Sequence, residues 1–376
     1  MLVKGLFWAS LGALAWTHAG YPVAAAALAR LRPREVRKDD LTPSVSLIVA
    51  AHNEEAVIGR RVENLLDLDY PPERLEIVVA SDASTDRTDE LVEEIAARES
   101  RVRLLRCPRG GKVAAQNRAV RETSGELLAF SDANVTWAAA ALRGIVRNFA
   151  DPEVAYVCGQ VRLAAAEGTN REGLYWRYEL WLRESESKLG SITAGNGGIY
   201  AVRREDYIDD DDPRVGHDLG FPYRLAQRGR RAVYEPDAVA FEKPSRDLED
   251  EYARKVRMIS RSWRPVLSGW MPRGTGPLYL VELVSHRVLR YSSGLLHVVL
   301  LGTSIALVRN GRPYQVALAA QLAWLALAAA GRLRAPVPGA ALAYYYLLMT
   351  WATVAALARY LQSGSPAMWE KAEGTR

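Results

Sequence analysis

The sequence predicts an α/β domain with a mostly parallel sheet and helices on both of its faces, joined to transmembrane α-helices. Three observations support this prediction. Short apolar runs alternate with amphipathic stretches from residue 43 onwards. Long, nearly uncharged stretches lie at both ends of the chain, and Arg, Asp and Glu are concentrated between them. The 376 residues leave room for one large domain in addition to these apolar segments.

The first apolar stretch, Leu6 to Ala29, is long enough to cross a bilayer, because about 20 apolar residues are needed. A cleaved signal peptide is the alternative, since Lys4 precedes the stretch and small residues occur later in it. A basic cluster follows immediately, formed by Arg30, Arg32, Arg34, Arg37 and Lys38. By the positive-inside rule, this cluster favours a retained membrane helix at residues 1–33 of a cell-membrane protein, with the next domain in the cytoplasm.

Four short apolar runs predict the first strands of the sheet, at residues 43–51, 75–80, 102–105 and 126–130. Helices are predicted between them, at residues 54–68, 86–98 and 112–123. Strands and helices that alternate in this way predict parallel pairing. Ligands of such sheets bind beyond the carboxyl ends of the strands, so the residues that follow each strand are the candidates for a site.

Polar or glycine-containing segments follow all four predicted strands. They read AHNEE (residues 51–55), SDASTDRT (81–88), RGGK (109–112) and SDAN (131–134). One such segment alone would be a turn or a helix cap, and Ser84, Thr85 and Asp86 are good capping residues. Four segments at one edge of a sheet predict a ligand-binding cleft.

The C-terminal third contains three further apolar stretches, separated by short hinges with arginine, at residues 292–308, 313–330 and 339–361. Buried helices of a large soluble protein are the alternative, but three such runs close together favour membrane spans. The sequence therefore predicts a cytoplasmic domain at residues 34–258, interfacial helices at 259–284, and a transmembrane bundle of about three helices with its tail at 285–376.

Composition narrows the class of function. Cys107 and Cys158 give neither a disulfide framework nor a metal-binding spacing, which fits a reduced compartment. The net charge of +5 fits a partnership with the anionic headgroups of a lipid bilayer. No aromatic and basic face typical of nucleic-acid binding is present, so no nucleic-acid partner is expected.

The motifs between residues 45 and 263 resemble the family 2 inverting glycosyltransferases of the nucleotide-diphosphosugar-binding (GT-A) fold. VSLIVAAHNEE, IVVASDASTDRT, GGKVAAQNRAV and GELLAFSDAN are similar to the strand-end motifs of that family. AGNGGIYAVRR, the segment from His217 to Glu242 and the tail MWEKAE resemble its later segments. The resemblance is to the membrane-embedded branch, which includes cellulose, hyaluronan and poly-N-acetylglucosamine synthases and single-transfer relatives. It implies a nucleotide diphosphosugar donor, a membrane lipid or glycan acceptor, and a divalent metal.

The resemblance implies that two residues at the end of the fourth strand hold this metal. Asp132 and Asn134 both present hard oxygen donors, which suit Mg²⁺ or Mn²⁺. Asn134 stands where the family has an acid, so the metal site carries one charge less. The other interpretation of Asn134 is a turn amide.

The other strand ends would bind the nucleotide sugar. The resemblance places Asp82 against the nucleotide base, although a turn acid is the alternative. It places Lys112 near base or phosphate, with a solvated lysine as the alternative. It assigns the nucleoside pocket to Ala51, Asn53 and Glu54, beside His52, which is more typical of packing. Ser81 departs from the family pattern, which has an Asp there.

An inverting transfer needs a general base that accepts the proton of the acceptor hydroxyl. In the family this base is the Asp of an acidic pair at a helix start. The pair reads His217-Asp218 here, so Asp218 is the predicted base. The acids from Asp209 to Asp212 compete for the role, but they are expected to form a solvated turn. A protonated His217 would lower the pKa of the base.

The remaining site residues belong to the acceptor and diphosphate side. The resemblance places Gly195, Asn196 and Gly197 there. The stretch RKVRM keeps Arg254 and Arg257, but it has Met258 where polymer-forming members carry a stacking Trp. Trp263 is either an acceptor contact or, with Trp270, part of an interfacial helix.

These features favour transfer of one sugar, or a few, to a membrane-bound or membrane-proximal acceptor hydroxyl. A processive polysaccharide synthase is the first alternative. The second is a catalytically inactive membrane scaffold of the same fold, which the departures at Ser81, Asn134 and His217 motivate. The sugar, the nucleotide, the oligomeric state and the orientation of the tail stay open.

Overall fold

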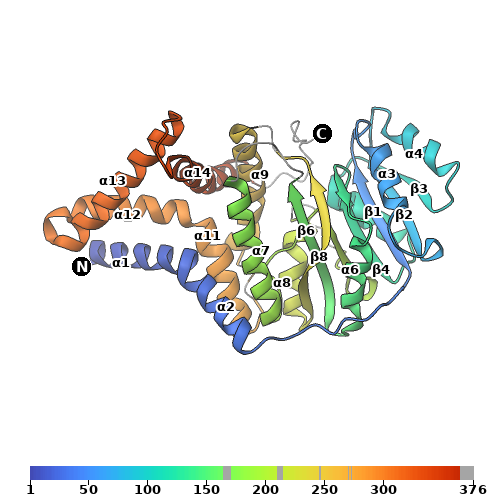
Figure 1. Cartoon of the computed structure of the whole chain (residues 1–376), viewed down its shortest axis with the longest axis horizontal. Helices are drawn as coiled ribbons and strands as arrows, with labels where there is room; N and C mark the ends of the chain where they lie inside the picture. The colour runs from blue at the N-terminus through green and yellow to red at the C-terminus, as the bar shows by residue number, and fades with distance from the viewer. Residues whose placement is uncertain (164–170, 210–214, 245–246, 270, 272, 365–376) are drawn as a thin grey trace.

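The computed structural model describes residues 1–163, 171–209, 215–244, 247–269, 271 and 273–364. A domain built on a β-sheet lies at one end of the molecule and a group of long helices at the other (Figure 1). Three parts of the sequence predictions fall outside the described residues, namely Trp270, the acids at 210–212 and the tail motif at 368–373.

The described strands form one eight-stranded mixed sheet in the order β3-β2-β1-β4-β7-β6-β8-β5. Their bounds are β1 (Val45–Ala51), β2 (Leu75–Asp82), β3 (Val102–Cys107), β4 (Leu127–Asp132), β5 (Val135–Trp137), β6 (Val154–Leu163), β7 (Tyr200–Arg203) and β8 (Arg231–Glu242). The four predicted strands, β1 to β4, pair in parallel, as the sequence predicts. β7 is antiparallel to β4 and β6, and β5 is antiparallel to β8.

Helices cover both faces of the sheet, so that every residue of β1 is buried. One face packs on α3 (Ile58–Leu66), α4 (Thr88–Ala96) and α6 (Ala141–Val146), and the other on α5 (Lys112–Arg121) and α8 (His217–Gln227). Successive residues of β1 alternate between these two cores, for example Leu47 in the first and Ile48 in the second. Short 3₁₀ turns complete the domain, namely η2 (Pro72–Arg74), η3 (Arg147–Ala150) and η4 (Arg204–Asp206).

The long helices come from both ends of the chain. The N-terminal ones follow one another without a break, as α1 (Leu2–Ala15), the π-helical turn η1 (Trp16–Gly20) and α2 (Tyr21–Leu31). The C-terminal ones are α12 (Ser293–Leu307), the turn η6 (Val308–Asn310), α13 (Arg312–Arg332) and α14 (Ala340–Ser363). Three helices of the described chain are long and apolar enough to cross a membrane, at residues 293–310, 312–332 and 340–363. They coincide with the three predicted C-terminal stretches.

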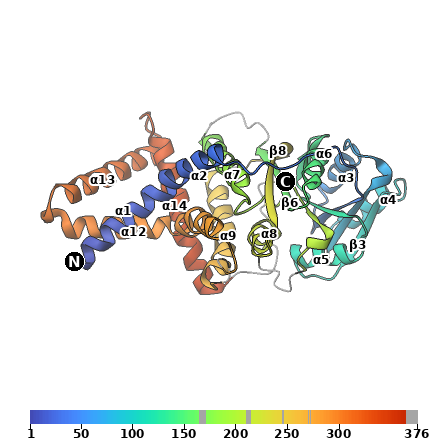
Figure 2. The ribbon, with the colours of Figure 1, turned by 90° about the horizontal axis from the view of Figure 1, so that it is seen from below.

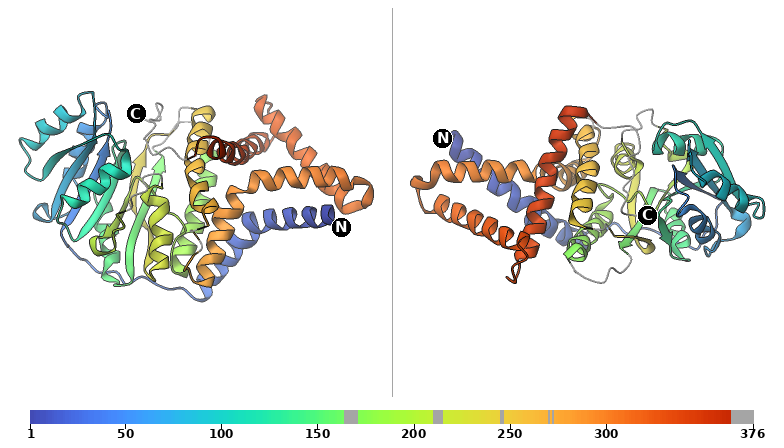
Figure 3. Two further views of the ribbon diagram at one scale, coloured as in Figure 1. Left: turned by 180° about the vertical axis from the view of Figure 1, so that it is seen from behind. Right: turned by 90° about the horizontal axis from the view of Figure 1, so that it is seen from above.

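Two further helices, α7 (Arg171–Leu189) and α9 (Leu248–Leu267), stand between the sheet and the long helices (Figure 3). From α9 the chain reaches α12 through α10 (Pro277–Glu282), η5 (Leu283–Val288) and α11 (Leu289–Tyr291). α1 lies beside α12, whereas α14 crosses α12 and runs along α9 (Figure 2). The domain boundary expected after residue 258 falls inside α9, which continues through it.

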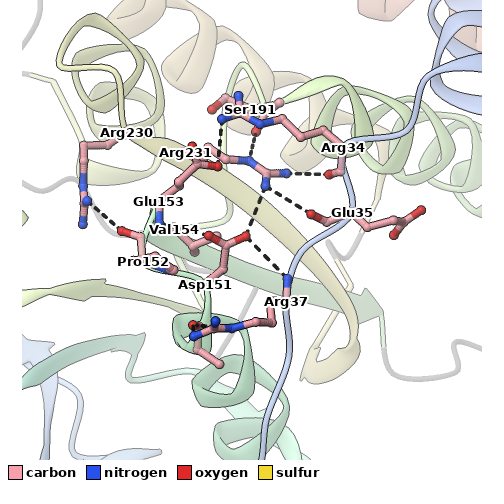
Figure 4. Close-up of polar contacts among 12 residues, drawn as sticks. Arg34, Glu35, Arg37, Asp151, Pro152, Glu153, Val154, Ser191, Arg230 and Arg231 are labelled. Carbon is pink, nitrogen blue, oxygen red and sulfur yellow. Dashed lines mark hydrogen bonds and ion pairs between the residues drawn. The ribbon is translucent and has the colours of Figure 1, made fainter.

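The segment between α2 and β1 is fastened to the sheet domain by Arg231, at the start of β8 (Figure 4). Arg231 is 2% exposed. Its guanidinium donates to the backbone carbonyls of Arg34 at 2.7 Å and Glu35 at 3.4 Å. It also pairs with Asp151 at 3.3 Å, and the Asp151 carboxylate in turn accepts a hydrogen bond from the backbone N–H of Arg37. The basic cluster after the first apolar stretch therefore lies along the domain.

Candidate active site

A cavity of about 810 Å³ opens beyond the carboxyl end of β4, and residues of α5, α8, α9 and α14 line it. It brings together many of the predicted site residues, namely Lys112, Asp132, Asn134, Gly195, Asn196, Gly197, Asp218, Arg254 and Arg257, with Met258 from the same motif. These residues come from distant parts of the chain, and the fold brings them together at the edge of the sheet, where the strand-end pattern predicts a cleft.

Three charged groups converge on Gly197. A Cβ atom placed on this glycine would lie 3.5 Å from Lys112 Nζ, 3.6 Å from Asp218 Oδ2 and 3.8 Å from Asp132 Oδ2. The hollow above Gly197 is thus about as wide as one methyl group, with two carboxylates and one ammonium around it. A reacting atom placed there would touch all three groups.

Asp132 ends β4, and its side chain is 30% exposed. Lys112, at the start of α5, forms an ion pair with Asp132 Oδ1. The second oxygen, Oδ2, is the one that lies near Gly197. The carboxylate therefore has one oxygen held by a cation of the protein and one that faces the cavity.

Glu242 belongs to this site, although no role was predicted for it. The β5–β8 pairing sets Glu242 opposite Val135, and Asn134 Nδ2 donates to Glu242 Oε1 at 3.3 Å. Glu242 also pairs with Arg254 at 3.5 Å. Burial raises the pKa of Glu242 above its ordinary range; the Arg254 charge opposes this shift, and the Asp132 charge adds to it. Only the position of Glu242 at the end of an apolar run could have suggested it.

Asp218 lies in the first turn of α8, after the N-cap residue Gly216. A carboxylate is favourable there, because the helix dipole places partial positive charge at the N-terminus. The backbone N–H of Gly195 donates to the Asp218 carbonyl at 2.7 Å and fixes this turn against the 194–198 segment. Of the competing acids, the described Asp209 is exposed and pairs with Arg121 on the surface at 2.6 Å.

His217 packs in an aromatic cluster on the sheet. Its Nδ1 is 2.9 Å from the Tyr200 hydroxyl, and its ring stacks on Phe221 at 4.5 Å. Burial lowers the pKa of His217 to about 3, with smaller contributions from the Lys112 and Arg224 charges. The imidazole is therefore neutral at ordinary pH, and the protonated His217 considered from the sequence does not arise.

A second group of predicted residues lies at the ends of β1 and β2. Asp82 is fully buried, and its carboxylate accepts hydrogen bonds from the backbone N–H groups of Gly110 and Gly111, the closest at 2.7 Å. It also forms an ion pair with Arg109. The loop 109–112 thus holds Asp82 at one end and Asp132, through Lys112, at the other.

The AHNEE segment closes this second group. Asn53 adopts a positive φ of 54°, and its side-chain oxygen accepts a hydrogen bond from the Thr85 N–H at 2.7 Å. Glu54 is buried, and its N–H donates to Thr88 Oγ1 at 2.7 Å. Ala51 ends β1 beside Ser81. These residues join the two strand ends and do not belong to the described lining of the cavity.

One face of α9 lines the cavity with Arg254, Arg257 and Met258, and Met258 is 49% exposed. Trp263 lies elsewhere. It is 4% exposed and packs near the Tyr291 ring at 6.2 Å, outside the described lining of the cavity. The helix turns by about 100° per residue, so a residue five positions after Met258 faces a different neighbour. Trp263 therefore does not share the cavity lining with Arg254, Arg257 and Met258.

The donor atoms at the end of β4 fit a hard divalent cation. Asp132, Asn134 and Glu242 offer two carboxylates and one amide oxygen, which are ligand types of Mg²⁺ and Mn²⁺. Within the described residues, no three His, Cys, Asp or Glu side chains form a complete ligand set by themselves. A cation here would therefore share its coordination with oxygen atoms of a bound substrate.

Comparison with known proteins gives a consistent result. Residues 46–211 match the model of the glycosyl transferase family 2. The chain is 32% identical over 211 residues to the beta-monoglucosyldiacylglycerol synthase of Nostoc sp., which covers 52% of this chain and 44% of that protein. It is 24% identical over 257 residues to the poly-beta-1,6-N-acetyl-D-glucosamine synthase of Staphylococcus aureus, covering 66% and 62%. The chain thus spans about half the length of these relatives.

One solved structure resembles almost the whole chain. It is the mannosyltransferase PcManGT from Pyrobaculum calidifontis in complex with GDP-Man and Mn²⁺, at 25% identity and a TM-score of 0.72. The likeness covers 96% of this chain and 97% of that one. The long helices are therefore shared together with the sheet domain, and the fold is a GT-A fold.

Proposed function

We propose that this chain, which carries a family 2 glycosyl transferase domain, transfers a sugar from a nucleotide diphosphosugar to an acceptor hydroxyl at the membrane, with inversion. The observation that carries the proposal is the convergence of Asp218, Asp132 and Lys112 on Gly197. A base, a carboxylate suited to a cation, and an ammonium around one small hollow are what a single displacement with an anionic leaving group requires.

In the proposed reaction, the acceptor oxygen attacks C1 of the sugar from the face opposite to the diphosphate. The bond from C1 to the acceptor oxygen forms, and the bond from C1 to the diphosphate oxygen breaks. The hydroxyl proton passes to Asp218, and the diphosphate leaves with the electron pair of the broken bond. The backbone contact between Gly195 and Asp218 holds the base in place for this step.

The leaving diphosphate needs positive charge around it. Lys112, Arg254 and Arg257 line the cavity on the side of β4 and α9 and would supply part of this charge. A bound Mg²⁺ or Mn²⁺ would supply the rest by neutralising the diphosphate oxygens, held by Asp132 and Asn134 with Glu242 beside them. The similar mannosyltransferase was solved in complex with Mn²⁺ and GDP-Man, which supports this assignment.

The nucleoside end of the donor would lie toward the second group of residues, Ala51, Asn53, Glu54 and Asp82. Asp82 already accepts hydrogen bonds from loop 109–112. We propose that Asp82 binds the nucleotide base and also positions this loop. The same loop carries Lys112, which would contact the diphosphate.

The acceptor is proposed to be a membrane lipid or a glycan held close to the bilayer. The cavity extends to one face of α14, a helix long and apolar enough to cross a membrane. The name of the Nostoc relative, a beta-monoglucosyldiacylglycerol synthase, supports a lipid acceptor. The exposed Met258 offers no aromatic surface on which a growing polymer could stack, so transfer of one sugar or a few is preferred to processive synthesis.

The base assignment is tested with Asp218→Asn in purified full-length protein. We expect transfer with Mn²⁺ and the productive donor to fall by about 100-fold or more, because general base catalysis is lost. Binding of the donor, measured by thermal shift, should be retained. Asp209→Asn is the matched control and should keep its activity, because Asp209 is paired on the surface. Normal turnover of Asp218→Asn would contradict the mechanism, and no turnover of any common donor by the wild type would favour the inactive scaffold.

The cation site is tested by the charge at position 134. In the absence of metal, Asn134→Asp places a carboxylate against Glu242, which now accepts a hydrogen bond from the Asn134 amide, so the melting temperature should fall. With Mn²⁺ and nucleoside diphosphate, the added charge should tighten metal binding by several fold. Isothermal titration with Mn²⁺ measures this, with Asp132→Ala expected to abolish binding. Equal Mn²⁺ affinity in all three proteins would place the cation elsewhere.

A further inference from the structure

A buried arginine of the cavity is not used by the proposed reaction. Arg183, on α7, lines the cavity on the side of the long helices and is 6% exposed. Its Nη1 atom has no hydrogen-bond partner. Within the described residues, the Arg183 guanidinium forms no ion pair with a carboxylate. The guanidinium lies 5.7 Å from the centre of the Tyr234 ring, and this is the one cation–π contact of Arg183 within the described residues.

This arrangement is unfavourable without a ligand. A buried charge needs a partner, because its loss of hydration is otherwise not compensated. Buried polar groups of folded proteins are almost always hydrogen-bonded. Three other cations of the same cavity follow that rule, since Lys112, Arg254 and Arg290 each pair with a carboxylate. Arg183 departs from it and therefore points to an anion that binds during function.

A second cation of the cavity comes from η5, which is joined to α7 by ion pairs of His286 with Glu179 and Glu186. Arg287, in η5, lines the cavity and donates from Nε to Thr193 Oγ1 at 2.9 Å. It forms no ion pair with a carboxylate of the described chain. Arg183 and Arg287 belong to elements that stand between the sheet domain and the long helices, whereas Lys112 lies beside β4. The anion at Arg183 is therefore distinct from the leaving diphosphate at Lys112.

The apolar part of the cavity lining indicates the kind of molecule. α14 contributes residues spaced along one helix face, among them Leu342, Tyr345, Met349 and Thr353. This helix is one of the three that are apolar enough to cross a membrane. A cationic site in the same cavity as an apolar helix suits a lipid that carries an anionic headgroup and an apolar chain.

We propose that Arg183, assisted by Arg287, binds a phosphate group in the headgroup of the acceptor lipid. The inference rests on the proposed function and names its acceptor class as a phosphate-bearing lipid. A guanidinium binds phosphate oxygens with charge-assisted hydrogen bonds, which the unpaired Nη1 atom can donate. Arg183 would hold the headgroup in the cavity that Asp218 also lines.

The test compares three probes on the full-length protein in detergent, namely dodecyl phosphate, dodecanol and inorganic phosphate. Wild-type protein should bind dodecyl phosphate at least tenfold more tightly than either of the other two. Arg183→Met should lose most of this preference. Arg177→Met, an exposed position on the same helix, is the matched control and should keep it.

Thermal stability separates a binding role from a structural one. Without ligand, Arg183→Met should melt at the same temperature as wild type or higher, because it removes an uncompensated buried charge. A lower melting temperature together with unchanged dodecyl phosphate affinity would overturn the proposal. If dodecanol binds as tightly as dodecyl phosphate, the site binds a neutral lipid. If inorganic phosphate binds as tightly, the site binds a free anion. Either result overturns the proposal.

Donor hydrolysis is measured on the same preparations, so that the two proposals fail separately. Hydrolysis without any preference for the lipid phosphate refutes the acceptor class alone. A preference for lipid phosphate that depends on Arg183, in a protein that turns over no donor, supports the site and refutes the transferase reaction.

Discussion

At the scale of single residues, two glycines of one segment have opposite roles. A Cβ atom at Gly195 would lie 2.1 Å from the Tyr156 hydroxyl, which leaves no room for a side chain. At Gly197 the nearest atom would be 3.5 Å away, which is an ordinary contact distance. Gly195 is therefore required for packing, whereas Gly197 keeps open the space in which the reacting atoms would meet.

We expect Gly195→Ala and Gly197→Ala to separate stability from activity. Gly195→Ala should lower the melting temperature, because overpacking a core typically costs about 1–3 kcal/mol. Gly197→Ala should melt like wild type but lose sugar transfer by about 100-fold, because its methyl group fills the hollow between Asp132 and Asp218. Melting curves and transfer rates of both variants provide the measurement. A fully active Gly197→Ala would place the reaction elsewhere in the cavity.

At the scale of elements, α8 owes its position to the aromatic cluster around His217. Phe221 stacks on the imidazole, and the Tyr200 and Tyr207 hydroxyls face its two nitrogens at 2.9 Å and 3.5 Å. Phe130 of β4 meets the same ring edge-on, with ring centres 5.5 Å apart. The neutral histidine thus anchors the helix that carries Asp218 to the strand that carries Asp132.

This anchoring makes stability depend on pH. The pKa of His217 falls from an ordinary value of 6.5 to about 3 in the folded chain. The unfolded chain therefore binds a proton first, and the stabilisation present above pH 6.5 is lost as the pH falls toward 3. Between pH 6.5 and pH 4, this one group should remove about 3 kcal/mol. His217→Gln cannot titrate there, so its unfolding midpoint should fall less steeply with acid; parallel pH profiles would contradict the assignment.

How much could be predicted at this scale depends on whether the contacts are local. Short apolar runs predict the strands β1 to β4. The polar residues that follow each run lie at the strand ends, so the cleft was predictable. Glu242 was not, because its place beside Asn134 depends on pairing between strands more than 100 positions apart in the chain. Arg183 was not, because the face of α7 that meets the cavity is set by packing. Trp263 was expected at the acceptor but lies outside the cavity lining for the same reason.

At the scale of the whole molecule, the chain between the membrane-proximal helices and the sheet domain is held by few buried groups. Arg231 and Asp151 form a buried pair with 2% and 10% side-chain exposure. The same guanidinium binds the carbonyls of Arg34, Glu35 and Gly190. Glu235 adds a second attachment through Lys38 at 2.8 Å. These contacts fix the domain relative to α2.

Arg231→Met should therefore destabilise the protein by about 3 kcal/mol, because it leaves Asp151 buried without its partner. Cleavage in the segment 32–44 by a protease should become faster at the same time. The matched control is Arg228→Met, at an exposed position of the same region, which should change stability by less than about 0.5 kcal/mol. Unfolding in urea and limited proteolysis measure both effects. Equal protease resistance in the two variants would show that other contacts hold the segment.

The four-residue loop 109–112 has a consequence for the order of events during turnover. Its first residue binds Asp82 and its last binds Asp132, and only two glycines lie between them. A ligand that competes with Arg109 for Asp82 must therefore shift the chain that positions Lys112. Binding of the nucleoside near Asp82 would therefore change the position of Lys112, beside which the diphosphate leaves. The donor is for this reason expected to bind before the acceptor.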